Sequence, residues 1–202
     1  MRNPCTGVIL AGGRNSRFGG QNKAFITLCG KTVLDHILDT FSGLFQDVLL
    51  ITKTPLDYLQ YDIHIATDIF PTSSSMAGVH AGLFYSETPF AFFAACDTPF
   101  LKKEMIQTIL DHIEAGCDAV MPETEAGLEP LCAAYSKNCL PLIESHIRQN
   151  RVKILRVFEK KRVIRVSENV LRQKDPDLIS FFNMNTPEDL KKAESLMGFQ
   201  LE

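Results

Sequence analysis

The stretch GVILAGGRNSRFGG, residues 7–20, joins a short apolar run to a loop that carries two Gly-Gly pairs and two arginines. The apolar run predicts a buried strand, and the glycines let the backbone that follows approach a ligand closely or adopt positive φ angles. Arginines in such a loop favour an anionic ligand, because guanidinium groups pair well with phosphate oxygens. The stretch therefore predicts a strand that opens into a binding loop for a phosphate-bearing small molecule.

The composition is that of a globular protein with 45% hydrophobic and 22% charged residues. We predict a single domain over residues 1–202, because this length is ample for one buried core. A net charge of -3 gives no basic field for nucleic acid or an anionic membrane, so we expect neither as a partner. No apolar run approaches the roughly 20 residues that span a bilayer.

The six cysteines are scattered and form no C-x-x-C pair. The apolar stretch near the N-terminus is too short for the core of a secretory signal. Together these features predict reduced thiols and a cytoplasmic protein, in which the cysteines serve packing rather than catalysis.

Short apolar runs alternate with amphipathic stretches along the first part of the chain. This alternation predicts an α/β fold with one doubly wound, mostly parallel sheet of Rossmann-like type. Strands are expected at 7–11, 47–52, 63–67, 90–95 and 118–122, and helices at 31–45, 77–87 and 102–115.

Beyond residue 122 the pattern is less regular. A final helix is expected to begin at Pro187, because Thr186 is a suitable N-cap and acidic residues fill the first turn. The other expected features are strands at 131–136 and 162–167, a helix over 138–149 that Pro141 opens or breaks, and a mobile segment at 168–180.

In a doubly wound sheet, ligands bind beyond the carboxyl ends of the strands at a topological switch point. The loops after residues 11, 67 and 95 should therefore meet at one crevice, which would contain the glycine-rich loop, Asp68 and Asp97. Two common phosphate-binding devices do not fit this chain. Phe25 stands where a P-loop ending in Gly30-Lys31-Thr32 needs its first glycine, and the G-x-G-x-x-G register of a dinucleotide site is absent.

The segment LAGGRNSRFGGQNKAF, residues 10–25, resembles the signature loop of nucleotidyltransferases with the glycosyltransferase-A-like fold. The amides of Gly12 and Gly13 can approach a nucleotide that a Cβ atom would push away. Arg17 and Lys23 can neutralise a triphosphate and the departing pyrophosphate. The matching positions are Leu10, Ala11, Gly12, Gly13, Arg17, Phe18, Gly19 and Lys23.

A second stretch, FAFFAACDTPFL at residues 90–101, brings Asp97 to the end of an apolar strand. A carboxylate in that place suits a hard cation such as Mg²⁺, which prefers oxygen ligands and keeps substrate phosphates among them. The structural alternative is that Asp97 caps the helix that starts near Lys102.

Residues 95–101 (ACDTPFL), residues 181–190 (FFNMNTPEDL) and the chain length are similar to those of molybdenum cofactor guanylyltransferases. The resemblance implies that GTP reacts with the phosphate of molybdenum-molybdopterin to give the guanine dinucleotide cofactor and pyrophosphate. It implies proteins of molybdenum cofactor biosynthesis or apo-molybdoenzymes as protein partners. By position it implies nucleotide contacts from Leu10, Ala11, Gly12, Gly13, Lys23, Asp68, Gly78 and Asp97.

The same resemblance implies catalytic roles for Arg17, Lys23 and Asp97, with Mg²⁺ on Asp97. Asn183 and Asn185 are further candidates near the metal, and turn formation is the alternative for both, since asparagine readily bonds local backbone. We expect residues 1–100 to bind the nucleotide and residues 101–202 to bind the acceptor.

The chain departs from the family pattern at three places. Asn22 replaces an aspartate, Ser74-Ser75-Met76 replaces Gly-Pro-Leu, and Glu129-Pro130-Leu131 replaces His-Pro-Thr. The last departure lies in the region associated with the acceptor and leaves its identity open. The alternatives are a nucleotidyltransferase that uses CTP or a sugar phosphate, and a nucleotide-binding regulatory or carrier protein without turnover. The basic stretch 148–162 is either a solvated face or a guide for the anionic acceptor.

Overall fold

The computed structural model describes residues 5–12 and 22–200. The strands are β1 (Cys5–Leu10), β2 (Thr27–Leu28), β3 (Lys31–Thr32), β4 (Val48–Ile51), β5 (His64–Ala66), β6 (Phe90–Ala95), β7 (Ala119–Thr124), β8 (Gly127–Leu128), β9 (Cys132–Ser136) and β10 (Val163–Ser167). The helices are α1 (Val33–Phe41), α2 (Ser75–Tyr85), α3 (Lys103–Asp111), α4 (Leu140–Arg148), α5 (Ile154–Val157), α6 (Glu168–Arg172) and α7 (Pro187–Gln200). Short 3-10 helices lie at Lys23–Phe25, Pro55–Tyr58, Lys137–Cys139 and Ile179–Phe181.

One large sheet runs through the molecule in the order β10-β7-β9-β6-β1-β4-β5, with β8 paired to β7. Strand β1 pairs in parallel with both β4 and β6, β5 extends the sheet in parallel beyond β4, and β10 pairs in parallel with β7. Strand β9 runs antiparallel between β6 and β7. The predicted doubly wound, mostly parallel sheet is confirmed.

The topological switch point lies between β1 and β6. The chain passes from β1 to β4 and β5 on one side, and then crosses back to β6 on the other side of β1. Leu10 pairs with Ala95 in this register, so the two strands end side by side. The loops that follow them diverge and leave a crevice, which is the usual ligand position in open α/β sheets.

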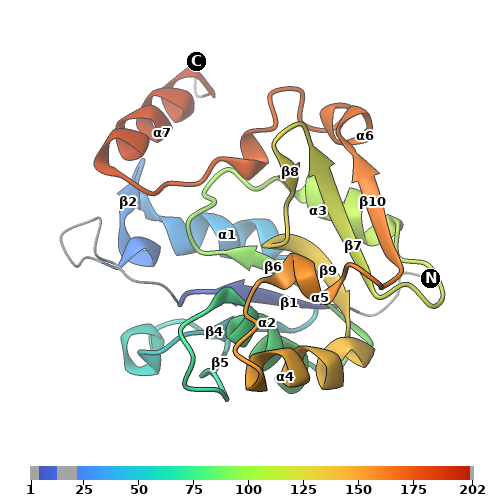
Figure 1. Cartoon of the computed structure of the whole chain (residues 1–202). Helices are drawn as coiled ribbons and strands as arrows, with labels where there is room; N and C mark the ends of the chain where they lie inside the picture. The colour runs from blue at the N-terminus through green and yellow to red at the C-terminus, as the bar shows by residue number, and fades with distance from the viewer. Residues whose placement is uncertain (1–4, 13–21, 201–202) are drawn as a thin grey trace.

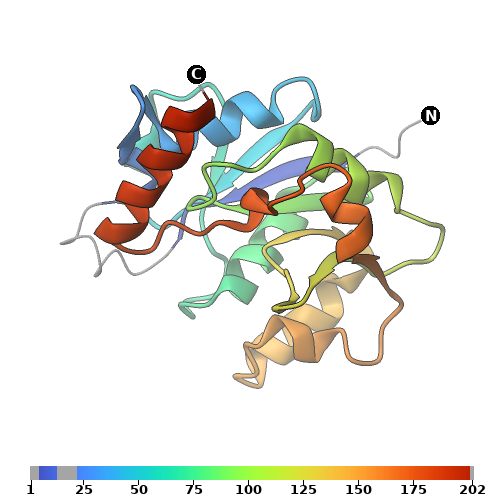
Figure 2. The same ribbon diagram turned by 90° about the horizontal axis from the view of Figure 1, so that it is seen from above.

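Helices cover both faces of the sheet (Figures 1 and 2). On one face, Ile9 and Phe92 share a buried cluster with residues of α1 and α3. On the opposite face, Val8 and Phe93 share a second cluster with residues of α2, α4 and α5. Alternate residues of β1 and β6 thus point to opposite layers, which explains why both strands are mostly apolar, with Thr6 as the polar exception.

Local sequence signals set the helix boundaries. Thr32 and Asp35 form a capping box at the start of α1, in which each side chain bonds the other residue's backbone. Pro141 lies in the first turn of α4, where its missing N–H costs nothing, so it opens the helix rather than breaking it. At α7, Asp189 N donates to Thr186 Oγ1 over 3.2 Å, which confirms the predicted N-cap.

The expected strands and helices of residues 1–122 are all present, with ends that differ by a few residues. The largest difference is the helix expected at 31–45, because Lys31–Thr32 pair with β2 and the helix ends at Phe41. The expected strands at 131–136 and 162–167 are β9 and β10. The sequence predicts β9 as a strand but not its direction, because an apolar run does not show whether the strand pairs in parallel or antiparallel.

The expectation of a mobile segment at 168–180 is wrong. This segment contains helix α6 and three fully buried residues, Leu171, Asp175 and Ser180. The carboxylate of Asp175 is buried against Lys102, a lysine from a distant part of the chain, and this contact orders the segment.

All six cysteines lie in the described part of the chain as free thiols. Burial raises the pKa of Cys5, Cys96 and Cys139 to about 12, so these groups stay protonated at neutral pH. This agrees with packing rather than nucleophilic roles. Within residues 5–12 and 22–200, no helix is long and apolar enough to cross a membrane.

Candidate functional site

A cleft of about 690 Å³ lies at the carboxyl ends of the central strands. Its volume is within the roughly 300–1,000 Å³ that is typical of small-molecule sites. The predicted site residues Leu10, Ala11, Gly12, Lys23, Asp68, Gly78, Asp97, Asn183 and Asn185 all line it. Gly13 and Arg17 lie outside the described residues.

The floor of the cleft is the end of β1. Ala11 N donates to Ile51 O over 2.9 Å and Cys96 N donates to Leu10 O over 3.1 Å, so the hydrogen bonding of the sheet continues one residue past the end of β1 and of β6. A Cβ atom built on Gly12 would meet nothing within 4 Å, so this residue faces open space. The backbone there is available to a ligand that lies across the strand ends.

Gly78 allows helix α2, which forms one wall of the cleft, to pack closely against the end of β1. A Cβ atom at this position would stand 3.0 Å from Leu10 Cδ2 and 3.9 Å from Asp68 Oδ1. A larger residue would require Leu10 to shift, whereas the distance to Asp68 is an ordinary van der Waals contact. The sequence signal at Gly78 is therefore explained by how closely α2 approaches β1.

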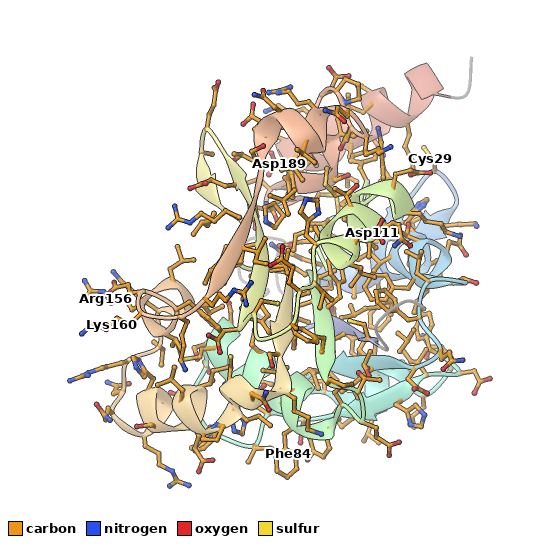
Figure 3. The ribbon with its side chains drawn as sticks, turned by 90° about the vertical axis from the view of Figure 1, so that its right-hand side faces the viewer. Cys29, Phe84, Asp111, Arg156, Lys160 and Asp189 are labelled. Atoms are coloured by element: carbon orange, nitrogen blue, oxygen red, sulfur yellow. The ribbon has the colours of Figure 1, made fainter. Side chains whose placement is uncertain are left out.

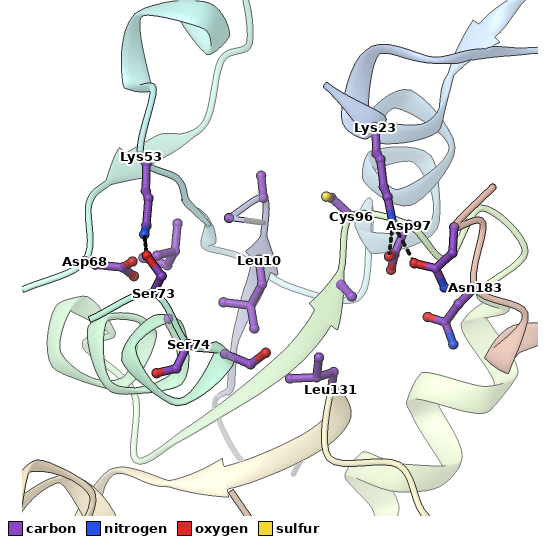
Figure 4. Close-up of a pocket in the computed structure, with 17 residues that line it drawn as sticks. Leu10, Lys23, Lys53, Asp68, Ser73, Ser74, Cys96, Asp97, Leu131 and Asn183 are labelled. Atoms are coloured by element: carbon purple, nitrogen blue, oxygen red, sulfur yellow. Dashed lines mark hydrogen bonds and ion pairs between the residues drawn. The ribbon is translucent and has the colours of Figure 1, made fainter. Parts of the chain in front are cut away.

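Lys23 joins Asp97 and Asn185 at one end of the cleft (Figure 4). The Nζ atom of Lys23 lies 3.1 Å from Asp97 Oδ2 and donates to Asn185 Oδ1 over 2.6 Å. The side chains of Lys23 and Asp97 are only 15% and 20% exposed, so water screens their charges weakly. Residues from three distant parts of the chain thus form one charged cluster.

Asn22 explains how Lys23 is held. Its Oδ1 atom accepts from Ala24 N over 3.1 Å and caps the 3-10 helix that begins at Lys23. Its Nδ2 atom donates to the hydroxyl group of the fully buried Tyr58 over 2.8 Å. The departure from aspartate at this position therefore retains a structural role next to the site.

Asp97 does not cap the following helix. Helix α3 begins at Lys103 with Lys102 as its N-cap and has no side-chain cap bond. The carbonyl of Asp97 instead accepts from Met184 N over 2.8 Å, and its carboxylate faces Lys23. This contradicts the structural alternative for Asp97 and leaves the carboxylate in the cleft.

The two asparagines differ in what they do. Asn185 accepts from Lys23 at this end of the cleft, whereas the Nδ2 atom of Asn183 donates to Phe181 O over 3.0 Å. Local turn formation therefore describes the observed bond of Asn183, although that residue also lines the cleft. Asp97 and both asparagines offer oxygen donors, which suit Mg²⁺ or a similar hard cation.

The opposite end of the cleft contains Asp68, Lys53 and Ser73 (Figure 4). Lys53 Nζ donates to Ser73 Oγ over 2.6 Å, which links the loop after β4 to the loop before α2. Burial raises the pKa of the Asp68 carboxyl group, and the charge of Lys53 partly opposes this.

Sequence reasoning missed Lys53 and Ser73 as lining residues. Lys53 follows a parallel strand that ends beside β1, so the rule used for Asp68 would also have found it. Ser74 and Ser75, at the position of one departure from the family pattern, also line the cleft.

The basic stretch 148–162 lies elsewhere. None of its residues, all of which the structure describes, lines the cleft. Arg148 pairs with Glu144 and Arg162 with Glu114, while Arg156 and Lys160 project away from the molecule (Figure 3). The structure favours the interpretation of a solvated face.

Comparisons with known proteins agree with this geometry. A family model described as MobA-like NTP transferase domain matches residues 7–166. The molybdenum cofactor guanylyltransferase of Desulfosudis oleivorans is 50% identical over 190 residues, which cover 94% of each chain.

Solved structures show the same arrangement. Molybdopterin-guanine dinucleotide biosynthesis protein A from Archaeoglobus fulgidus matches with a TM-score of 0.85 at 33% identity, covering 96% of this chain and 99% of the other. The 4-diphosphocytidyl-2C-methyl-D-erythritol synthase of Anaerococcus prevotii matches with a TM-score of 0.72 at 17% identity, over 97% and 96% of the two chains, and shares the fold alone. From its sheet topology, its cleft and these matches, the chain belongs to the family of MobA-like nucleotidyltransferases.

Proposed function

We propose that this protein transfers GMP from GTP to the phosphate of molybdenum-molybdopterin, forming the guanine dinucleotide cofactor and pyrophosphate. The family match and the similarity to a molybdenum cofactor guanylyltransferase support the reaction class and the substrates. The observation that carries the proposal is the cluster of Lys23, Asp97 and Asn185 at the β1/β6 switch point.

The two ends of the cleft suit the two ends of a nucleotide. The triphosphate lies at the end of Lys23, which supplies the positive charge that phosphate oxygens require. The base lies toward Asp68, where a carboxylate can accept from the N–H groups of guanine. The backbone of Leu10 to Gly12 spans the space between them.

A divalent cation, which we take to be Mg²⁺, fits the oxygen donors at the Lys23 end. Within the described residues no group of three or more His, Cys, Asp or Glu side chains forms a metal site. The cation would instead be held by Asp97, by amide oxygens of Asn185 or Asn183, and by substrate phosphates, a donor set that Mg²⁺ commonly has. When bound, it supplies Lewis-acid polarisation of the phosphates.

The transfer needs positioning rather than a protein nucleophile. An oxygen of the acceptor phosphate attacks the α-phosphorus of GTP, and the bond from that phosphorus to the β-bridging oxygen breaks. The electron pair leaves with pyrophosphate. Lys23 offsets the negative charge on the leaving group, and the low exposure of its side chain strengthens this effect.

Gly13 and Arg17 lie outside the described residues, and their roles in nucleotide binding and catalysis stay predictions from the sequence. We assign residues 1–100 to the nucleotide, since most lining residues belong to them, and residues 101–202 to the acceptor. Leu131, the last residue of the Glu129-Pro130-Leu131 departure in the region associated with the acceptor, lines the cleft. Asn183 and Asn185 belong to the second part of the chain but line the end of the cleft that we assign to the phosphates.

Release of pyrophosphate tests the proposal. The four nucleoside triphosphates are each supplied with Mg²⁺, with and without molybdenum-molybdopterin. We expect release only with GTP and acceptor together. Release with CTP in preference to GTP, or release without regard to the acceptor, would reject the guanylyltransferase assignment. The proposed setting is the cytoplasm, with molybdenum cofactor biosynthesis proteins or apo-molybdoenzymes receiving the product.

A further inference from the structure

Asp175 is a fully buried carboxylate that lies outside the cleft. Both of its oxygens are bound: Oδ1 lies 2.8 Å from Lys102 Nζ, and Oδ2 accepts from Ser180 N over 2.7 Å. Lys102 is 73 residues away in the sequence, and its side chain is 32% exposed. The pair therefore ties a C-terminal segment to the loop before α3.

Residues 175–185, which we term the strap, run along residues 97–102, the Asp97 loop. Besides the Asp175 pair, Lys102 N donates to Ser180 Oγ over 3.2 Å. The rings of Phe100 and Phe182 meet edge to face with centroids 5.7 Å apart. These contacts follow one another in order along both segments.

The far end of the strap is part of the site. Met184, which is fully buried, donates its amide to Asp97 O over 2.8 Å. The next residue, Asn185, accepts from Lys23 Nζ over 2.6 Å. The position of the Asn185 amide oxygen thus depends on how the strap is docked on the Asp97 loop.

Burying a carboxylate is costly unless its charge and lone pairs are matched. A buried ion pair gains little net stability over apolar packing, but removal of one partner is strongly destabilising. Such a pair therefore fixes one arrangement of the segments it joins more than it adds stability. Asp175 and Lys102 have this property at the point where the strap begins.

We propose that Asp175 is a positioning residue that fixes the strap on the Asp97 loop and so holds Asn185 against Lys23 in the cleft. It touches no substrate. The proposal rests on the proposed function only in that Lys23 and Asn185 serve the transfer reaction, while the docking of the strap can be measured without it.

A double-mutant cycle between Asp175→Asn and Asn185→Ala tests the proposal on the full chain. The first readout is the rate at which an acylating reagent modifies Lys23, followed by mass spectrometry of the Lys23 peptide. The second is kcat and KM for GMP transfer. Asp175→Asn should raise the acylation rate of Lys23 and lower kcat by about tenfold, with KM for GTP little changed.

The coupling between the two substitutions tests whether Asp175 acts through Asn185. In the Asn185→Ala background, Asp175→Asn should have little further effect on Lys23 acylation, because Asn185 is the group through which Asp175 acts. Independent, additive effects would overturn the proposal, and so would an unchanged acylation rate in Asp175→Asn. If the two substitutions show the expected coupling in Lys23 acylation but the wild-type protein transfers no GMP, the proposed function is rejected and the positioning role of Asp175 is retained.

Asp118→Asn is the matched control. Asp118 Oδ2 likewise accepts from a backbone amide, Arg162 N at 2.9 Å, and Oδ1 lies 3.9 Å from Lys161 Nζ. It contacts neither the strap nor the cleft, so it should leave Lys23 acylation and kcat unchanged. Effects equal to those of Asp175→Asn would show general destabilisation and overturn the proposal. If Asp175→Asn does not fold, Lys102→Met breaks the same pair from its more exposed side and undergoes the same cycle.

Discussion

At the scale of single residues, the charged cluster in the cleft explains why this chain needs a lysine and an acid so far apart in sequence. Lys23 and Asp97 are separated by 74 positions and meet at 3.1 Å with little exposure. Both could be assigned from sequence because each follows a recognisable strand or loop. Asn185 could be placed near the metal only by resemblance, since its bond to Lys23 spans 162 positions.

Asp97→Asn should abolish metal-dependent transfer while the fold is retained. The amide keeps the size of the side chain and loses the charge that holds a hard cation and pairs with Lys23. We expect kcat to fall by at least about 100-fold, as when one charge-stabilising contact of a transition state is lost. Initial rates across a Mg²⁺ titration measure this, with Asp111→Asn on the exposed end of α3 as control. Near-normal rates at limiting Mg²⁺ would contradict the metal assignment.

Lys23→Met should weaken triphosphate binding and slow transfer. The substitution removes a cation from the phosphate end of the cleft but keeps an unbranched side chain. The loss of one charge-assisted contact is worth about 1.5–3 kcal/mol, or roughly 10- to 150-fold in the dissociation constant of GTP. Calorimetric titration with GTP measures the change.

Lys53→Met is the matched control for Lys23→Met, since Lys53 lines the same cleft at its other end and pairs with Ser73 instead of Asp97. It should leave the contribution of the triphosphate, taken as the GTP to guanosine affinity ratio, unchanged. If the ratio is also unchanged in Lys23→Met, Lys23 does not contact the triphosphate.

At the scale of elements, apolar runs and capping residues predicted most of the strands and helices. The strand at 90–95 has the predicted bounds, and Thr186 caps α7 as expected. The segment 168–180 was mispredicted because its order comes from a tertiary contact, the ion pair of Asp175 with Lys102. Local sequence contains no sign of that partner. The pairing of Lys31–Thr32 with β2 was missed for a similar reason, since strands of two residues carry no periodicity.

The Asp175 pair should make stability depend on acid pH. Burial favours the neutral acid, but the bonds from Lys102 and Ser180 outweigh it, so the pKa of Asp175 in the folded protein is below its usual value. A depressed pKa stabilises the fold fully above the unfolded value of about 3.9. That contribution is lost as the pH falls from there toward the folded pKa.

Wild-type protein should therefore lose free energy of unfolding more steeply than Asp175→Asn as the pH falls below about 4. Urea unfolding at a series of pH values measures both slopes. Other acids, such as Asp189, contribute equally to both proteins and leave the difference to Asp175. Parallel slopes would show that Asp175 is not ionised and paired in the folded state.

At the scale of the whole molecule, the order of strands creates the site. Because β4 and β6 flank β1, the chain leaves the sheet edge in opposite directions and the cleft opens between them. The sheet class and the position of the crevice were predictable from the alternation of apolar and amphipathic segments. The antiparallel β9, which carries the wall toward Leu131, was not, since pairing direction depends on contacts between distant strands.

Nucleotide preference belongs to this scale, because the two ends of the cleft come from different halves of the sheet. We expect GTP to bind at least about tenfold more tightly than CTP, ATP or UTP, which corresponds to about 1.4 kcal/mol. The half-buried carboxylate of Asp68 can accept from two adjacent N–H groups on the edge of guanine at once, whereas adenine, cytosine and uracil offer it no such adjacent pair of ring and amino N–H groups. Competition binding with all four nucleotides measures the preference, and a clear preference for CTP would exclude guanine recognition by this cleft.

Labelled GTP distinguishes nucleotidyl transfer from simple hydrolysis or phosphoryl transfer. The protein is incubated with Mg²⁺, molybdenum-molybdopterin and GTP that carries the label on either the α- or the γ-phosphorus. If Lys23 and Asp97 direct attack at the α-phosphorus, the α-label appears in the dinucleotide product and the γ-label appears in pyrophosphate. Recovery of the γ-label in the acceptor or in inorganic phosphate, or the absence of α-label from the acceptor, would contradict GMP transfer by this protein.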